Sequence, residues 1–154
     1  MLNPGRPFDL PAYVEKLSPD LGYAILTATI VEEQLEMLLL AHLQLDDDGV
    51  AAWFGNYKNN SFAGKIREAH ERGLIDDEPH CDLAVIKDIR NAFAHTRERL
   101  DFKAPQRKAL AERFGGHTKD VDVRRLFDER VSRVVTAIQA KMDRITYDEA
   151  TAGK

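Results

Sequence analysis

The hydrophobic positions of this chain recur at spacings of three and four residues, which is the period of one face of an α-helix. Between positions 20 and 43 the apolar face holds Ala24, Ala28, Val31, Leu35, Leu38 and His42. Glu32, Glu33 and Glu36 lie off that face. The pattern predicts a long core-facing helix from Asp20 to Leu43, followed by an irregular aromatic loop with Trp53, Phe54 and Tyr57. In that loop the aromatic rings are either partner contacts or plugs of the core.

Three further helices are predicted later in the chain. One begins after Ser61, a good N-cap residue, and ends at Gly73. The next begins after the acidic run that ends at Pro79, which suits the start of a helix. The last runs from Val121 to Tyr147, and its apolar positions are Phe127, Val131, Val134, Ile138, Met142 and Ile145.

The absence of any useful alternating pattern argues against β-strands. We therefore expect an all-α, single-domain bundle of four main helices, with short additional helices at about 11–17 and after Pro105. The expected organisation is an N-terminal extension over 1–17, a helical bundle over 18–147 and a flexible polar tail over 148–154. A length of 154 residues fits one domain with a real core.

Charge is distributed unevenly along the chain. The net charge is −4, but residues 1–56 carry a balance of −7 and residues 57–154 a balance of +3. The overall sign argues against generic nucleic-acid binding, and no helix fits a DNA-reading element. A basic run in the second half contains Arg97, Arg99, Lys103, Arg107 and Lys108. It is either a solvated face or a contact surface for RNA or a protein partner.

Cysteine and histidine usage limits the compartment and the cofactors. A lone cysteine, Cys81, cannot form an internal disulfide, and we expect it to act as a small buried hydrophobe. The N-terminus lacks a signal-peptide pattern, and three glutamates interrupt the most apolar stretch, so we expect a cytoplasmic protein with no membrane span. The histidines and Cys81 do not fall at zinc-ligand spacings. We expect no metal and no cofactor.

One segment could carry chemistry, namely Arg90-Asn91 with His95 four residues further on. A histidine that moves protons near neutral pH and an arginine that stabilises phosphate charge can together cleave RNA without a metal. In a continuous helix, however, an offset of five residues turns Arg90 and His95 about 140° apart. They converge only if the helix ends before His95 or a second subunit completes the site. Alternatively, Arg90 holds a carboxylate of the long helix, and His95 satisfies a helix end.

The stretch from Ser18 to Phe102 resembles the mannitol operon repressor family. The resemblance is carried by a set of short motifs in a fixed order: Phe62, Lys65-Ile66, Gly73-Leu74-Ile75, Ile89-Arg90-Asn91, Phe93-Ala94-His95 and Leu100-Asp101-Phe102. One departure is visible, since the family usually carries a basic residue after the aspartate that opens the long helix, and here Leu21 follows Asp20. Glu32 and Glu33 stand where the family has acidic residues, and the resemblance implies them as candidate partners of Arg90.

The resemblance implies an all-helical repressor of transcription that acts through a protein partner, as a homodimer, without reading DNA directly. The Arg90-Asn91…His95 pattern also resembles the HEPN superfamily. Many HEPN proteins are metal-independent ribonucleases whose arginine and histidine meet at a dimer interface. That resemblance implies an alternative function as an endoribonuclease, with His95 as acid/base, Arg90 as phosphate clamp and Asn91 as positioning group.

Overall fold

The computed structural model describes residues 19–95 and 122–153, and the regular structure in these ranges is entirely helical. The helices are α2 (Pro19–Leu43), α3 (Asp47–Gly55), α4 (Tyr57–Asn60), α5 (Phe62–Glu71), α6 (Asp77–His95) and α8 (Val123–Ala152). The all-α prediction is confirmed. Within these ranges no helix is long and apolar enough to cross a membrane.

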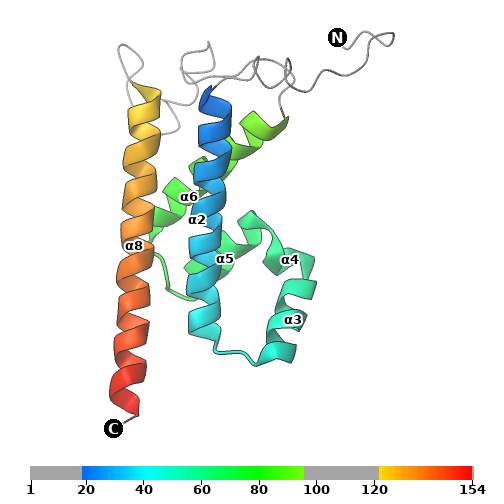
Figure 1. Ribbon diagram of the computed structural model, residues 1–154, viewed down its shortest axis with the longest axis vertical. Coiled ribbons are helices and arrows are strands. Elements are labelled where there is room, and N and C mark those ends of the chain that lie inside the picture. The colour runs from blue at the N-terminus through cyan, green and yellow to red at the C-terminus, as the bar shows by residue number, and fades with distance from the viewer. Residues whose placement is uncertain (1–18, 96–121, 154) are drawn as a thin grey trace.

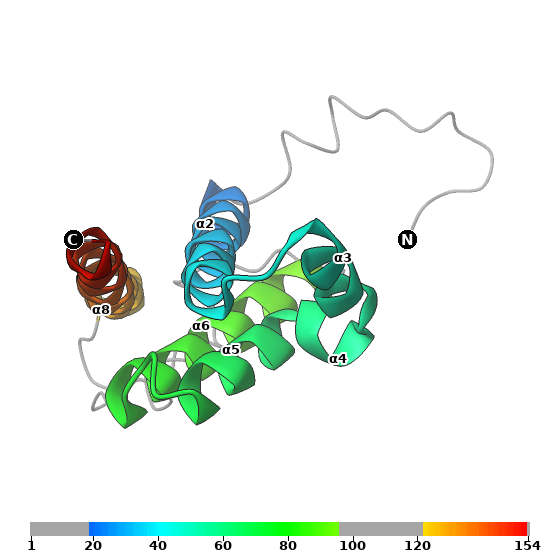
Figure 2. The same ribbon diagram turned by 90° about the horizontal axis from the view of Figure 1, so that it is seen from below.

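Helix α2 is the centre of the arrangement, because it contacts α5, α6 and α8. Helices α2 and α8 lie side by side and point the same way, while α5 and α6 run next to each other and cross them on one side (Figures 1 and 2). Helices α3 and α4 form an arm that leaves the C-terminal end of α2 and returns to α5 (Figure 1).

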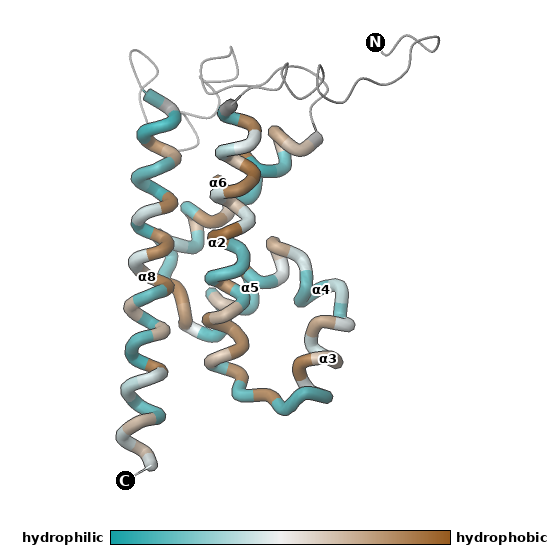
Figure 3. The backbone as a smooth tube through the Cα atoms, viewed as in Figure 1, coloured by the Kyte–Doolittle hydropathy of each residue, from teal (hydrophilic) through white to brown (hydrophobic). Residues whose placement is uncertain are grey.

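The core forms where the apolar faces of these helices meet, as the alternation of apolar and polar segments along the tubes indicates (Figure 3). The buried positions include Ala24, Ala28, Val31, Leu35 and Leu38 of α2, Leu83, Ile86, Ile89 and Phe93 of α6, and Phe127, Val134 and Ile138 of α8. These positions are the ones that the helical period predicts. The prediction that His42 faces the core is wrong. His42 is exposed, and Leu39 is buried instead.

The segment expected to be an aromatic loop is helical. Asp46 caps α3 by accepting a hydrogen bond from the Gly49 amide, and Asn56 caps α4 by accepting one from the Lys58 amide. Neither helix buries a residue fully. Trp53 packs partly against the core, whereas Tyr57 is 85% exposed.

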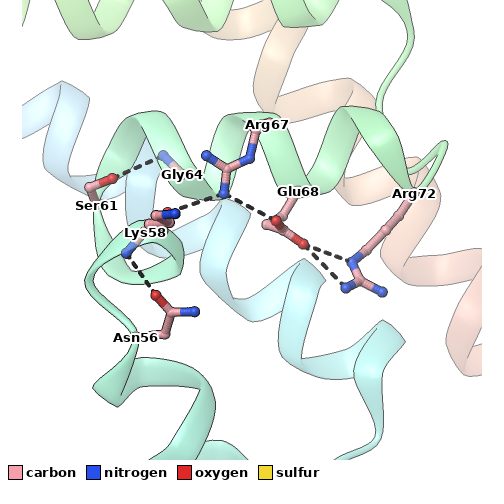
Figure 4. A network of polar contacts seen from close by, with 7 residues as sticks. All are labelled: Asn56, Lys58, Ser61, Gly64, Arg67, Glu68 and Arg72. Carbon is pink, nitrogen blue, oxygen red and sulfur yellow. Dashed lines mark hydrogen bonds and ion pairs between the residues drawn. The ribbon is translucent and has the colours of Figure 1, made fainter.

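The junction of α4 and α5 is tight, and a glycine permits it (Figure 4). Ser61 caps α5 by accepting a hydrogen bond from the Gly64 amide at 3.0 Å. A Cβ on Gly64 would lie 1.8 Å from the Lys58 carbonyl oxygen, so a larger residue does not fit. Arg67 donates to the same carbonyl at 3.3 Å and also pairs with Glu68. Gly73, at φ +67°, follows the end of α5 as predicted.

The last helix continues past Tyr147 to Ala152, so the tail expected from 148 is helical over most of its length. Polar residues alone did not end it, since Asp148, Glu149 and Thr151 are compatible with an exposed helix. Several expectations lie outside the described residues, namely the extension over 1–17, the turns after Pro105 and the basic run of Arg97, Arg99, Lys103, Arg107 and Lys108.

Candidate functional site

Arg90 lies in α6 and faces α2 and α5. Its Nη2 is 3.4 Å from Glu32 Oε2, and its guanidinium carbon lies 5.6 Å from the centre of the Phe62 ring. The ion pair is long and the side chain is partly exposed, so each contact alone is weak. Together they hold Arg90 against the body of the protein.

Glu32 also binds a second cation, Lys65 of α5. Lys65 Nζ lies 3.0 Å from Glu32 Oε1 and 2.6 Å from Glu36 Oε2, and the lysine is only 5% exposed. Burial by itself lowers the pKa of Lys65, but the hydrogen bonds to Glu36 and Glu32 outweigh burial and raise it above its usual value. Lys65 is therefore held in its charged form.

We call Glu32, Glu36, Lys65 and Arg90 the Glu32 cluster. It brings two carboxylates and two cations together from α2, α5 and α6. Charges taken out of water need partners, and here each has one. Among the described residues no buried side-chain nitrogen or oxygen lacks a hydrogen-bond partner. The cluster is thus balanced without a ligand, and it joins three helices.

The fold of a single chain does not bring His95 next to Arg90. Helix α6 is continuous through His95, so the turn that would have brought His95 toward Arg90 is not present. At about 100° per residue the two positions are about 140° apart around the helix. Asn91 is partly buried, and the side chain of His95 lies outside the described residues.

Glu33 is exposed, unlike the neighbouring Glu32, and lies on the opposite side of α2 from the core. At about 100° per residue, Leu26, Ile30, Glu33 and Met37 fall within about 60° of one another. We call these four residues the α2 outer face. Leu26 is 63% exposed, Ile30 47% and Met37 53%. Singly exposed leucines are ordinary, whereas here three large exposed apolar side chains share one helix face.

A second charge cluster, around the buried Asp82, joins α6 to α8 and was not predicted from the sequence. Asp82 is buried and binds Arg133, with Nε to Oδ2 at 2.7 Å, while Arg130 lies 3.7 Å away. Arg133 also pairs with Glu78. Burial raises the pKa of Asp82 above its usual value, although Arg133 works in the opposite direction. In the sequence, Asp82 falls at an apolar position of the helical period of α6, beside Leu83, and this position could have predicted its burial.

Asp20, at the start of α2, is bound by an arginine of the last helix. Asp20 Oδ1 accepts a hydrogen bond from Arg124 Nη1 of α8 at 3.2 Å. The Arg124 guanidinium also lies 3.7 Å from the centre of the Tyr23 ring, and the Tyr23 hydroxyl donates to Asp128. An acidic residue at the start of α2 therefore has its cation in α8, which sequence spacing could not reveal.

The histidines and Cys81 form no metal site in the described parts of the chain. His70 and His80 stack with ring centres 4.0 Å apart, and His70 Nε2 lies 2.8 Å from Asp77 Oδ1. No group of three or more histidine, cysteine or acidic side chains in those parts could hold a metal ion. Cys81 is exposed, so its expected role as a buried hydrophobe is wrong.

No protein-family model, curated protein or solved structure matches this chain. The resemblance to the mannitol operon repressor family and to the HEPN superfamily therefore rests only on the motifs named above.

Proposed function

We propose that this protein is a regulator of transcription of the mannitol operon repressor type, and that it acts by binding another protein. We also propose that α2, α5, α6 and α8 are the four main helices of a HEPN-like bundle. Support for the second point is that α2 contacts the other three and that α6 contacts both α5 and α8.

The observation that carries the proposed function is the α2 outer face. Three large apolar side chains point to solvent along the helix that organises the core. Exposing them has no benefit to the folded chain, because apolar surface left in water loses about 25 cal/mol for each Å² that burial would have removed. A surface of this kind is typical of proteins that bind other proteins.

The ribonuclease alternative finds less support. It requires an arginine that is free to bind a phosphate beside a histidine. Within one chain Arg90 instead shares Glu32 with Lys65, and α6 runs on without a break to His95, so a ribonuclease site would need a second subunit. We therefore assign Arg90 to the fold and the function to the outer surface.

The proposal is tested by transcript profiling of the source cells carrying Ile30→Asp at the native locus, beside a deletion strain. The matched control is Ala140→Asp, which places the same charge on an exposed position of α8. We expect Ile30→Asp to alter the same transcripts as the deletion, and Ala140→Asp to leave them unchanged. A normal profile for Ile30→Asp, with the protein at normal abundance, contradicts the proposal.

A further inference from the structure

We infer that the α2 outer face binds an amphipathic helix of another protein, and that this helix carries a lysine or arginine opposite Glu33. The inference rests on the function proposed above and names the chemistry of the partner. Its three parts are the shape of the face, its charge and the poor fit of a second copy.

The shape of the face suits a helix. Leu26, Ile30 and Met37 lie at spacings of four and seven residues, and the row extends about 16 Å along α2 at 1.5 Å per residue. This is three turns of helix. Helices that dock on such surfaces use anchors at the same spacings. The N-terminal end of the row is flat, because Gly22 is exposed and nothing lies within 4 Å of the position of its Cβ.

The charge of the α2 outer face favours a partner helix that carries a basic residue. Between Pro19 and Leu43 the chain contains no lysine or arginine. Lys65 and Arg90 reach α2 from other helices, but they bind Glu32 and Glu36. Within 19–95 and 122–153, Glu33 has no ion pair, and it lies between Ile30 and Met37 along the row of exposed apolar side chains. A purely apolar partner would bury this carboxylate without a partner, which is unfavourable. A basic residue at that position would complement it.

A second copy of this chain fits the face less well. A symmetric contact through this face would place one α2 on another, and neither α2 carries a lysine or arginine to meet Glu33. Each carboxylate would face apolar side chains or the other carboxylate. A different protein with a basic amphipathic helix avoids this conflict.

Two synthetic helical peptides test the inference on the full-length protein. Both are roughly 18 residues long and have leucine at relative positions 0, 4 and 11, and they differ only in having lysine or glutamate at position 7. Binding is measured by fluorescence anisotropy with the wild type, Glu33→Lys, Ile30→Asp and the control Ala140→Asp. Circular dichroism establishes that each variant is folded.

We expect the wild type and Ala140→Asp to bind the lysine peptide roughly two- to fivefold more tightly than the glutamate peptide, the range for one exposed ion pair. Glu33→Lys should reverse the order, and Ile30→Asp should weaken both peptides about tenfold or more. Equal binding of the two peptides, no binding of either, or no reversal in Glu33→Lys overturns the inference.

Two other occupants are excluded or found by separate measurements. Sedimentation equilibrium of the wild type and Ile30→Asp detects a second copy: a dimer that Ile30→Asp dissociates would overturn the inference. Maleimide labelling of Leu26→Cys in a Cys81→Ser background detects cover by the chain's own segments: slow labelling of the folded monomer would also overturn the inference.

If the peptides fail but Ile30→Asp still alters transcripts, only this inference fails. If the transcripts are also normal, the proposed function fails with it.

Discussion

Arg90 of α6 and Glu32 of α2 meet through an ion pair of 3.4 Å, and the other oxygen of the same carboxylate binds Lys65 at 3.0 Å. The arginine of the one motif that suggested catalysis is thereby part of a charge cluster between three helices. In the structure Arg90 pairs with the Glu32 carboxylate and lies over the Phe62 ring.

The two cations of the Glu32 cluster should differ in their importance for stability. Lys65→Met should lower the free energy of unfolding by about 1–3 kcal/mol, because Glu36 loses this cation and Glu32 keeps only the more distant Arg90. Arg90→Ala should lower it by about 1 kcal/mol, since its pair is longer and more exposed. Urea unfolding measures both. The control Lys58→Ala, at an exposed position, should change it by less than about 0.5 kcal/mol. An Arg90→Ala effect larger than that of Lys65→Met contradicts this ranking.

The contribution of Lys65 should also depend on alkaline pH. The pKa of Lys65 is raised in the fold from its ordinary value of 10.5. Its charge therefore stabilises the fold fully below pH 10.5, and the stabilisation is lost as the pH rises through the folded pKa. We expect the difference in unfolding free energy between the wild type and Lys65→Met to shrink above about pH 10.5. A constant difference across that range would argue that Lys65 acts by packing alone.

Two glycines should respond in opposite ways to alanine. Gly22→Ala should stabilise the protein by about 0.5–1 kcal/mol, because the site is helical and open and alanine has the higher helix propensity. Gly64→Ala should destabilise it by about 2 kcal/mol or more, since the new Cβ would meet the Lys58 carbonyl and push α4 from α5. Thermal melts distinguish the two. The close approach at Gly64 is disproved if both substitutions stabilise.

The Asp82 carboxyl should titrate above its ordinary pKa of 3.8 despite its contact with Arg133. Burial is the main cause and Arg133 opposes it, so Arg133→Gln should raise the pKa further. Because the folded pKa is raised, the stability linked to Asp82 protonation is present below pH 3.8 and is lost as the pH rises through the folded pKa.

Carbon-detected NMR of the aspartate carboxyl groups measures this pKa. The control is Arg125→Gln, whose side chain pairs with the exposed Glu129 and should leave Asp82 unchanged. A pKa of Asp82 that falls or stays constant in Arg133→Gln would contradict the assignment.

Local patterns predicted most of the fold. Ser61 and Gly73 mark the ends of α5 by capping and by a left-handed backbone, both of which are properties of single residues. The period of three and four placed Leu83, Ile86 and Phe93 in the core. The arm was missed because α3 and α4 bury nothing fully, so their sequences carry no strong apolar period.

The polar contacts of the interior were harder to predict. The family resemblance suggested Glu32 and Glu33 as partners of Arg90, but it could not distinguish between them, and they lie on different sides of α2. Asp82 and Arg133 are 51 positions apart, and Asp20 and Arg124 are 104 apart. Such pairs depend on how helices pack, which local sequence does not determine. Lys65 was the better signal, because it falls on the apolar face of α5 with Phe62 and Ala69, and a lysine there needs a carboxylate partner.

The most direct test of the structural role of Arg90 is whether the protein cleaves RNA. Purified wild type is incubated with single-stranded and structured RNA in EDTA, beside His95→Ala and Arg90→Lys, and the folding of each is checked by circular dichroism. We expect the wild type to cleave no more RNA than either variant. Cleavage by the wild type that both folded variants lose would contradict it, and would make Arg90 a catalytic residue rather than a partner of Glu32.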